Sequence, residues 1–194
     1  MLPLENAAVE AAALPAKLKA ASTGVPSAVT LVAASPAKLI AFKTAAGEYL
    51  DDRALIQAIT DFIRADDRFD YRVLVGTDSE VQEDSIDFVS AIVIHRVGRG
   101  ARYFWRRTIV TERYELRQRL WEEALMSLDV SQQLLELLRH LDGSFRFELH
   151  LDLGMVGKSH SVVREITNMV RSYGVAYKLK PESYAASKIA DRLI

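Results

Sequence analysis

The chain of 194 residues contains no cysteine. Disulfide bonds, thiolate metal sites and cysteine nucleophiles are therefore excluded, so any bound metal ion must use oxygen or imidazole ligands. No apolar run approaches the roughly 18 residues of a membrane-spanning helix, and Glu5 and Glu10 interrupt the first residues. The absence of cysteine is also typical of a reducing compartment. We expect a cytoplasmic protein that is neither secreted nor inserted in a membrane.

A net charge is almost lacking as well, at -1 for the whole chain, so composition provides no general attraction to nucleic acid. The charge is nevertheless uneven, because seven arginines and only two glutamates lie between Arg99 and Arg119. Aromatic residues are interleaved with these arginines, a combination that can bind phosphates and stack on bases. The structural alternative is an exposed strand whose other face is core. The candidate nucleic-acid contacts in this stretch are Arg99, Arg102, Arg106 and Arg107.

Proline is scarce outside the N-terminal part of the chain. Residues 1–41 contain four of the five prolines and thirteen alanines. Because proline interrupts helices and strands, we predict that residues 1–41 are a partly ordered arm. The rest of the chain, residues 42–194, has length for one ordinary hydrophobic core and is predicted to form one domain.

Hydrophobic periodicity predicts alternating strands and helices in residues 42–194. An amphipathic helix capped by Asp51 or Asp52 comes first, and a long helix that opens near Thr111 follows three strands. The predicted strands are 71–77, 88–96, 102–110, 145–151 and 175–179, and the later helices are 161–173 and 184–193. Three meandering strands followed by helix-strand units predict an α/β fold with a mixed sheet and helices on both faces.

Two aspartates each close an apolar run that is predicted to be a strand. Asp78 follows the first of these strands and Asp152 follows the fourth. If the two strands are neighbours, the carboxylates lie roughly 5 Å apart at one edge of the sheet. Ionised carboxylates at that separation repel each other unless a cation lies between them. The sequence therefore predicts a divalent metal site where open α/β sheets bind their ligands.

The order of elements resembles the ribonuclease H fold, and short sequences support this resemblance. Thr77-Asp78-Ser79 follows the first strand, and Ala190-Asp191-Arg192-Leu193 lies in the last predicted helix. More narrowly, four segments resemble the YkuK-type family of bacterial ribonuclease H-like proteins, whose function is unsettled: residues 76–79, 99–107, 150–154 and 180–186. The resemblance covers about residues 42–194. It implies a five-stranded sheet of order 3-2-1-4-5 in which strand 2 is antiparallel.

The resemblance also implies a site with two divalent ions, Mg²⁺ or Mn²⁺, held by carboxylates around the scissile phosphate. Asp78 would bridge the ions, whereas Asp152 and Asp191 would each hold one. A glutamate of the long helix completes the set. Glu123 lies beside the apolar stripe of that helix when about 100° is counted per residue, whereas Glu115, nearer the helix start, is the alternative.

Three further residues are candidates for contact with the substrate. Lys158 precedes a helix within a glycine-containing stretch that is two residues too short for a nucleotide-binding loop. Lys158 and Lys180 are candidate phosphate contacts, and His160 is a candidate proton shuttle to the leaving group. The ordinary alternative for each is a solvated loop residue.

Together these features predict a metal-dependent nuclease or phosphodiesterase that acts on RNA, DNA or a hybrid. The alternative is a ribonuclease H-like module that binds nucleic acid or acts as a scaffold without catalysis, because a fold does not determine a reaction. A third possibility is a phosphate loop of the actin and sugar-kinase type at residues 76–79. Such enzymes close two domains around ATP, and this chain has length for only one.

Overall fold

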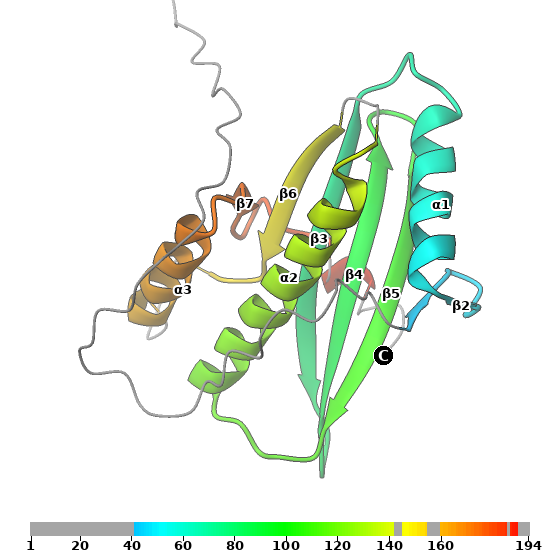
Figure 1. Ribbon diagram of the computed structural model, residues 1–194. Coiled ribbons are helices and arrows are strands. Elements are labelled where there is room, and N and C mark those ends of the chain that lie inside the picture. Colours follow the sequence, from blue (N-terminus) through cyan, green and yellow to red (C-terminus); the bar gives the residue numbers. More distant parts are fainter. Residues whose placement is uncertain (1–40, 142–144, 155–159, 186, 190–194) are drawn as a thin grey trace, which may run out of the picture. The chain divides into compact units, whose positions relative to one another are not determined.

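A computed structural model describes residues 41–141, 145–154, 160–185 and 187–189, which belong to one compact unit, Ala34–Ile194. The predicted arm of residues 1–41 lies outside the described residues except for Ala41. The elements (Figure 1) are β1 (Phe42–Lys43), β2 (Tyr49–Leu50), α1 (Asp52–Arg64), β3 (Tyr71–Val81), β4 (Ile86–Arg96), β5 (Ala101–Val110), α2 (Leu116–Leu138), β6 (Phe145–Leu151), α3 (His160–Ser172) and β7 (Tyr177–Lys178).

The strands form one mixed sheet in the order β2-β1-β5-β4-β3-β6-β7. Its last five strands confirm the predicted order 3-2-1-4-5, with β4 antiparallel to both of its neighbours and β6 parallel to β3 and β7. The prediction omitted β1 and β2, which have two residues each and are too short for a periodic hydrophobic pattern. β1 adjoins β5 through the single pair Lys43↔Trp105.

The end of β3 differs from the prediction. Pairing with β6 stops at Thr77↔Leu151, but pairing with β4 continues to Val81↔Ile86. Asp78 therefore lies inside β3, at the point where the parallel pairing ends, and not at the end of the strand. The reason is that antiparallel hydrogen bonds to β4 keep the residues after Asp78 extended without a second neighbour.

Both helices that precede β6 place apolar residues against the sheet. The Asp51 carboxylate accepts a hydrogen bond from the backbone N–H of Ala54 at 2.7 Å, which confirms the predicted cap of α1. α2 begins at Leu116 with Glu115 as its N-cap residue, later than the predicted start near Thr111. Within the described residues, no helix combines the length and the apolar character that crossing a membrane requires.

The two faces of the sheet pack against different parts of the chain. Val73 and Val75 belong to the core formed with α1, α2 and α3, and Figure 1 shows α1 and α2 against this side, called here the helix face. Leu74 points to the other side and packs against Ala185 and Ile189, so we call it the C-terminal face. Both faces are thus covered, as predicted. Residues 187–189 are helical, and residues 190–193 of the predicted last helix lie outside the described residues.

Candidate functional site

Asp78 lies in a row of residues that crosses the sheet where its parallel pairing ends. Asp78 pairs with Val89 of β4, and Val89 pairs with Arg107 of β5. Residues directly opposite each other point to the same side of a sheet, and Asp78 shares the side of Leu74, which is the C-terminal face. Because neighbouring strands are about 4.8 Å apart, the backbone of Arg107 lies about 10 Å from that of Asp78.

Asp152 and Lys180 extend this row on the other side of Asp78. The parallel register of β3, β6 and β7 places Asp152 beside Asp78 and Lys180 beside Asp152. The Lys180 ammonium is 2.7 Å from Asp152 Oδ1, and the Lys180 backbone N–H donates to the Leu153 carbonyl at 3.3 Å. We call Arg107, Asp78, Asp152 and Lys180 the edge row. It has a basic residue at each end and two acidic residues between them.

Glu123 of α2 meets β3 from the helix face, immediately next to the edge row. Its side chain is buried, with 6% of the residue exposed, and its Oε1 accepts a hydrogen bond of 2.5 Å from the Ser79 hydroxyl. Ser79 follows Asp78 and points to the opposite side of the strand. Glu123 thus faces the sheet, as its place beside the apolar stripe of the helix predicts. The alternative, Glu115, is exposed at the N-cap of α2.

The surroundings of Glu123 make its ionisation costly at neutral pH. Burial is the main cause that raises the pKa of Glu123 to about 7, and the hydrogen bond from Ser79 opposes it. The nearby negative charge of Asp78 raises the pKa further, whereas the charges of Arg119 and Lys180 lower it. Arg119 lies one helical turn before Glu123, and its Nε is buried without a hydrogen-bond partner in the described part of the chain. Asp78 and Glu123 therefore lie within electrostatic reach of each other.

The donor types at this position suit a hard divalent cation, because Asp78, Asp152 and Glu123 all offer carboxylate oxygens. The arrangement is not a ready cage, however. Among the described residues, no three acidic or histidine side chains are close enough together to hold one ion. One reason is that Asp152 already holds the Lys180 ammonium. The residues thus fit an ion bound near Asp78 and Glu123, with Asp152 occupied by an internal cation.

Three of the predicted site residues fall where the structure gives no side-chain position. Asp191 and Lys158 lie outside the described residues. His160 is the first residue of α3, but its side chain is outside the described part, so its role as a proton shuttle stays a prediction.

His150 was not selected from the sequence, yet it organises the C-terminal face beside Asp152. Its residue is 3% exposed, and its Nδ1 accepts hydrogen bonds from the backbone N–H groups of Tyr184 and Ala185 at 3.1 and 3.3 Å. Burial lowers the pKa of the imidazole, which keeps Nδ1 available as an acceptor. His150 thus holds the segment that follows Lys180 against β6. A polar residue at an inward position of an alternating strand is the sequence signal that could have identified it.

The structure divides the candidate arginines between the two faces of the sheet. Arg102 and Arg106 point to the helix face, where their guanidinium groups lie over the rings of Phe62 and Phe42, at 5.4 and 5.2 Å from the ring centroids. Burial lowers the pKa of Arg106. Only Arg107 shares the C-terminal face with Asp78.

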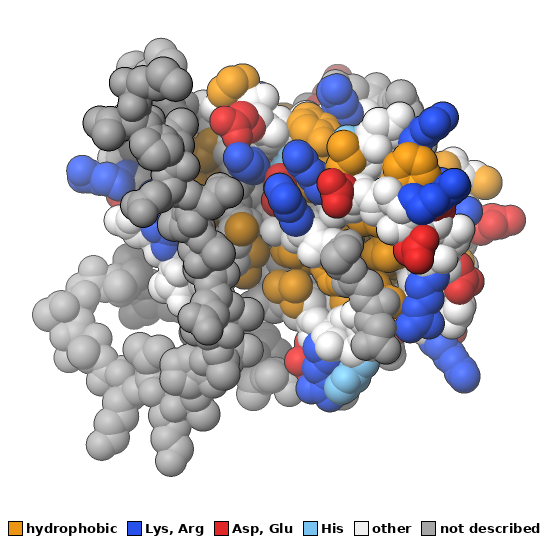
Figure 2. All heavy atoms as spheres, turned by 90° about the horizontal axis from the view of Figure 1, so that it is seen from above, with side chains coloured by type: hydrophobic (Ala, Val, Ile, Leu, Met, Phe, Trp, Pro, Cys, Tyr) orange, Lys and Arg blue, Asp and Glu red, His pale blue; other side chains and the backbone are white. Residues whose placement is uncertain are grey.

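Arg99 lies far from the edge row, in the β4–β5 hairpin, with its guanidinium 5.8 Å from the centroid of the Phe69 ring. The hairpin is seven or more residues along β4 from Val89, or about 23 Å. Figure 2 views the domain from this end and shows lysines and arginines interspersed with acidic side chains, without one continuous basic patch. The structure therefore brings Arg107 and Lys180, but not Arg99, Arg102 or Arg106, into one row with the aspartates.

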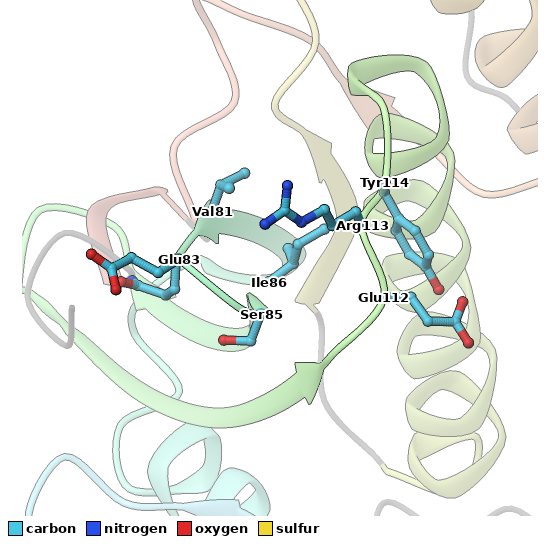
Figure 3. Close-up of a pocket in the computed structure, with 8 residues that line it drawn as sticks. Val81, Glu83, Ser85, Ile86, Glu112, Arg113 and Tyr114 are labelled. Atoms are coloured by element: carbon cyan, nitrogen blue, oxygen red, sulfur yellow. The ribbon is translucent and has the colours of Figure 1, made fainter.

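The described residues also line cavities outside the edge row, and two of these bear on the proposed contacts. One, of about 230 Å³, lies between the end of the β3–β4 hairpin and the loop before α2. Figure 3 shows the Arg113 side chain directed toward Val81 and Ile86. Because Glu83 and Glu112 also line this cavity, it has no positive excess, and we assign it no phosphate. The other, of about 520 Å³, lies between α1 and the start of β5.

Comparisons with known proteins agree with this architecture. The family described as ribonuclease H-like matches residues 54–194. An uncharacterized protein of Bacillus subtilis (strain 168), YkuK, is 30% identical over 153 residues, which cover 71% of this chain and 87% of YkuK. No solved structure matches the chain.

Proposed function

The chain belongs to the ribonuclease H-like family, and from this premise we propose that it is a nuclease or phosphodiesterase that requires Mg²⁺ or Mn²⁺. The observation that supports the proposal is the position of Asp78 beside Asp152 where the parallel pairing of β3 and β6 ends, with the buried Glu123 near enough to Asp78 for their charges to interact. Open α/β sheets bind ligands at this edge. The proposed substrate is RNA, DNA or a hybrid.

Each residue has a separate role in this proposal. Asp78 and Glu123 would hold the ion. Burial makes the negative charge of Glu123 costly, and a bound cation offsets that cost. The Ser79 hydroxyl fixes the orientation of the Glu123 carboxylate. A bound ion would activate water as the nucleophile and neutralise charge on the phosphate. Arg107 lies on the same face as Asp78 and binds a flanking phosphate of the substrate. This contact holds the nucleic-acid backbone across the edge row.

Substitution of Asp78 tests the proposal. Purified protein is given labelled single-stranded, duplex and hybrid nucleic acids with Mn²⁺, and wild type is expected to cut at least one of them. Asp78→Asn keeps the shape of the side chain but removes its charge, so cutting should fall by at least about 100-fold. Asp70→Asn, just before the opposite end of β3, is the matched control and should cut like wild type. Equal cutting by Asp78→Asn would reject the site, and no cutting by wild type would reject catalysis.

A non-catalytic nucleic-acid-binding or scaffold module is the second candidate, and one observation favours it. The pairing of Asp152 with Lys180 removes one carboxylate from the set that would otherwise hold cations. Calorimetric titration separates the two functions. Nucleic-acid affinity without any binding of Mg²⁺ or Mn²⁺ would support the module.

A further inference from the structure

We propose that the Lys180 ammonium is a built-in cation of the carboxylate site. The site then binds one divalent ion and not the two that the resemblance of the chain to ribonuclease H implies. This inference rests on the proposed function, because it concerns the same site. Lys180 then acts as a positioning residue that holds and neutralises Asp152. It is not a phosphate contact of the kind suggested by the sequence alone.

The position of Lys180 follows from the backbone and not only from one side-chain rotamer. β7 pairs with β6 through Leu149↔Tyr177 and His150↔Lys178, and continuing this register puts Lys180 next to Asp152. The hydrogen bond from the Lys180 N–H to the Leu153 carbonyl holds the two segments together beyond the strands. The backbone therefore places Lys180 next to Asp152, just beyond the ends of β6 and β7.

The contact is a close ion pair without the geometry of a hydrogen bond, because Asp152 Oδ1 has no hydrogen-bond partner among the described residues. The distance between Lys180 Nζ and Asp152 Oδ1 is 2.7 Å, the Asp152 side chain is 14% exposed and the Lys180 side chain is 53% exposed. Such a sheltered carboxylate gains more from a fixed positive charge than an exposed one. The charge of Lys180 also acts on Glu123, whose pKa it lowers. The Lys180 ammonium thus interacts electrostatically with two carboxylates, that of Asp152 just after β6 and that of Glu123 on α2.

The charge balance favours one divalent ion over two. Asp191, the fourth predicted carboxylate, lies outside the described residues. Among the described residues, Asp78, Asp152 and Glu123 contribute three negative charges when ionised and Lys180 contributes one positive charge, which leaves a net charge of -2 on these four groups. One divalent ion neutralises this charge, whereas a second ion would leave an uncompensated positive excess. Arg119, whose charge also acts on Glu123, moves the balance further toward a single ion.

Lys180→Met tests the inference, because methionine keeps a similar length of side chain without the charge. MnCl₂ is titrated calorimetrically into the full chain, free of nucleic acid. Wild type is expected to bind one Mn²⁺. Without the competing ammonium, Lys180→Met should bind a second Mn²⁺, or bind the first at least about tenfold more tightly.

Lys178→Met is the matched control. It removes the same charge two residues away, where Lys178 pairs with Glu182 at 2.6 Å on the exposed surface. This variant should bind Mn²⁺ like wild type. Lys180→Arg, which keeps the positive charge, should also retain one Mn²⁺ and provides the test if Lys180→Met does not fold by circular dichroism.

Several outcomes would overturn the inference: two Mn²⁺ ions in wild type or in Lys180→Arg, unchanged binding in folded Lys180→Met, or an equal gain in Lys178→Met. The absence of Mn²⁺ binding in both wild type and Lys180→Met would also overturn it. Failure of the proposed function looks different. One Mn²⁺ in wild type and a gain in Lys180→Met, without cutting of any nucleic acid, would support the role of Lys180 and reject the nuclease.

Discussion

The two ends of the sheet use charged side chains in opposite ways. At the β4–β5 hairpin, the Arg96 guanidinium lies over the rings of Phe62 and Tyr71, 4.6 and 5.5 Å from their centroids, and donates to the Tyr71 hydroxyl at 2.9 Å. Next to the edge row, the buried Glu123 carboxylate accepts a hydrogen bond from the Ser79 hydroxyl and, among the described residues, from no other group. Arginine at the first end stacks on rings and donates hydrogen bonds within the fold, whereas the buried Glu123 at the second end is costly to ionise. The position of a charge therefore indicates function better than its abundance in the sequence.

The largest effect that would sharpen this comparison concerns Glu123 and pH. Its folded-state pKa of about 7 lies above the usual value of 4.5 for a glutamate, so the folded protein holds this proton more tightly. The resulting stabilisation is complete below pH 4.5 and is lost as pH rises through 7, by at most about 3 kcal/mol. Glu123→Gln should remove this loss in urea unfolding at pH 5 and pH 8 without divalent ions. Glu115→Gln, at an exposed position at the start of α2, should leave this loss unchanged. An equal change in the free energy of unfolding between pH 5 and pH 8 for wild type and both variants would contradict the assignment of the raised pKa to Glu123.

A somewhat smaller effect is expected at the hairpin. Arg96→Ala removes the hydrogen bonds to the Tyr71 hydroxyl and the Phe62 carbonyl together with the ring contacts, so the free energy of unfolding should fall by about 2–3 kcal/mol. Arg107→Ala, which loses an ion pair of 3.6 Å with Asp87, should cost less than about 1 kcal/mol. Urea unfolding measures both variants. Equal losses would break the distinction between the two ends.

His150 should give a pH dependence of opposite sign to that of Glu123. Burial lowers its folded-state pKa below the usual value of 6.5 for a histidine, so its contribution to stability is complete above pH 6.5 and is lost as pH falls toward the folded-state pKa. His150→Gln should be less stable than wild type by about 1–2 kcal/mol at pH 7.5, because two backbone N–H groups lose their acceptor. The difference should narrow at pH 5 in thermal or urea unfolding. A constant difference would show that protonation of His150 is not responsible.

The smallest predicted effect distinguishes the two faces of β5. Arg107→Ala should weaken nucleic-acid binding about tenfold and reduce the salt dependence by about one phosphate contact. Arg102→Ala changes the same residue type on the same strand but on the helix face, so the affinity should change less than about twofold. Fluorescence anisotropy in EDTA measures binding without cleavage. A larger loss with Arg102→Ala would move the proposed contact to the hairpin end.

Much of the fold could be predicted from hydrophobic periodicity. The strands β3, β4, β5 and β6 and the first helix could be predicted because each contains enough residues for a period of 2 or 3.6. The predicted strand 175–179 is shorter in the structure, where β7 has two residues. The end of β3 was placed too early, because Asp78 and Ser79 read as polar turn residues. Their extended conformation depends on hydrogen bonds to β4, which are a tertiary contribution. β1 and β2 owe their conformation to the edge of β5 in the same way.

The candidate site could be predicted less completely. The adjacency of Asp78 and Asp152 follows from strand order, and the burial of Glu123 follows from the helical period. The pairing of Lys180 with Asp152 depends on the register of a two-residue strand, which no local pattern specifies. The division of the arginines between the two faces could have been predicted, because side chains alternate along a strand. Arg102 and Arg106 are four residues apart and share one face, whereas Arg107 is one residue further and points to the other.

The pairing of β3 has a consequence for how its carboxylate can move. Asp78 is carried by a segment bonded to β4 on both sides of it, whereas Asp152 comes one residue after β6 has ended. We expect amide hydrogen exchange to be slow at Asp78 and faster at Asp152. Asp78 would then be fixed in space, whereas Asp152 could change its contact with Lys180 without any rearrangement of the sheet.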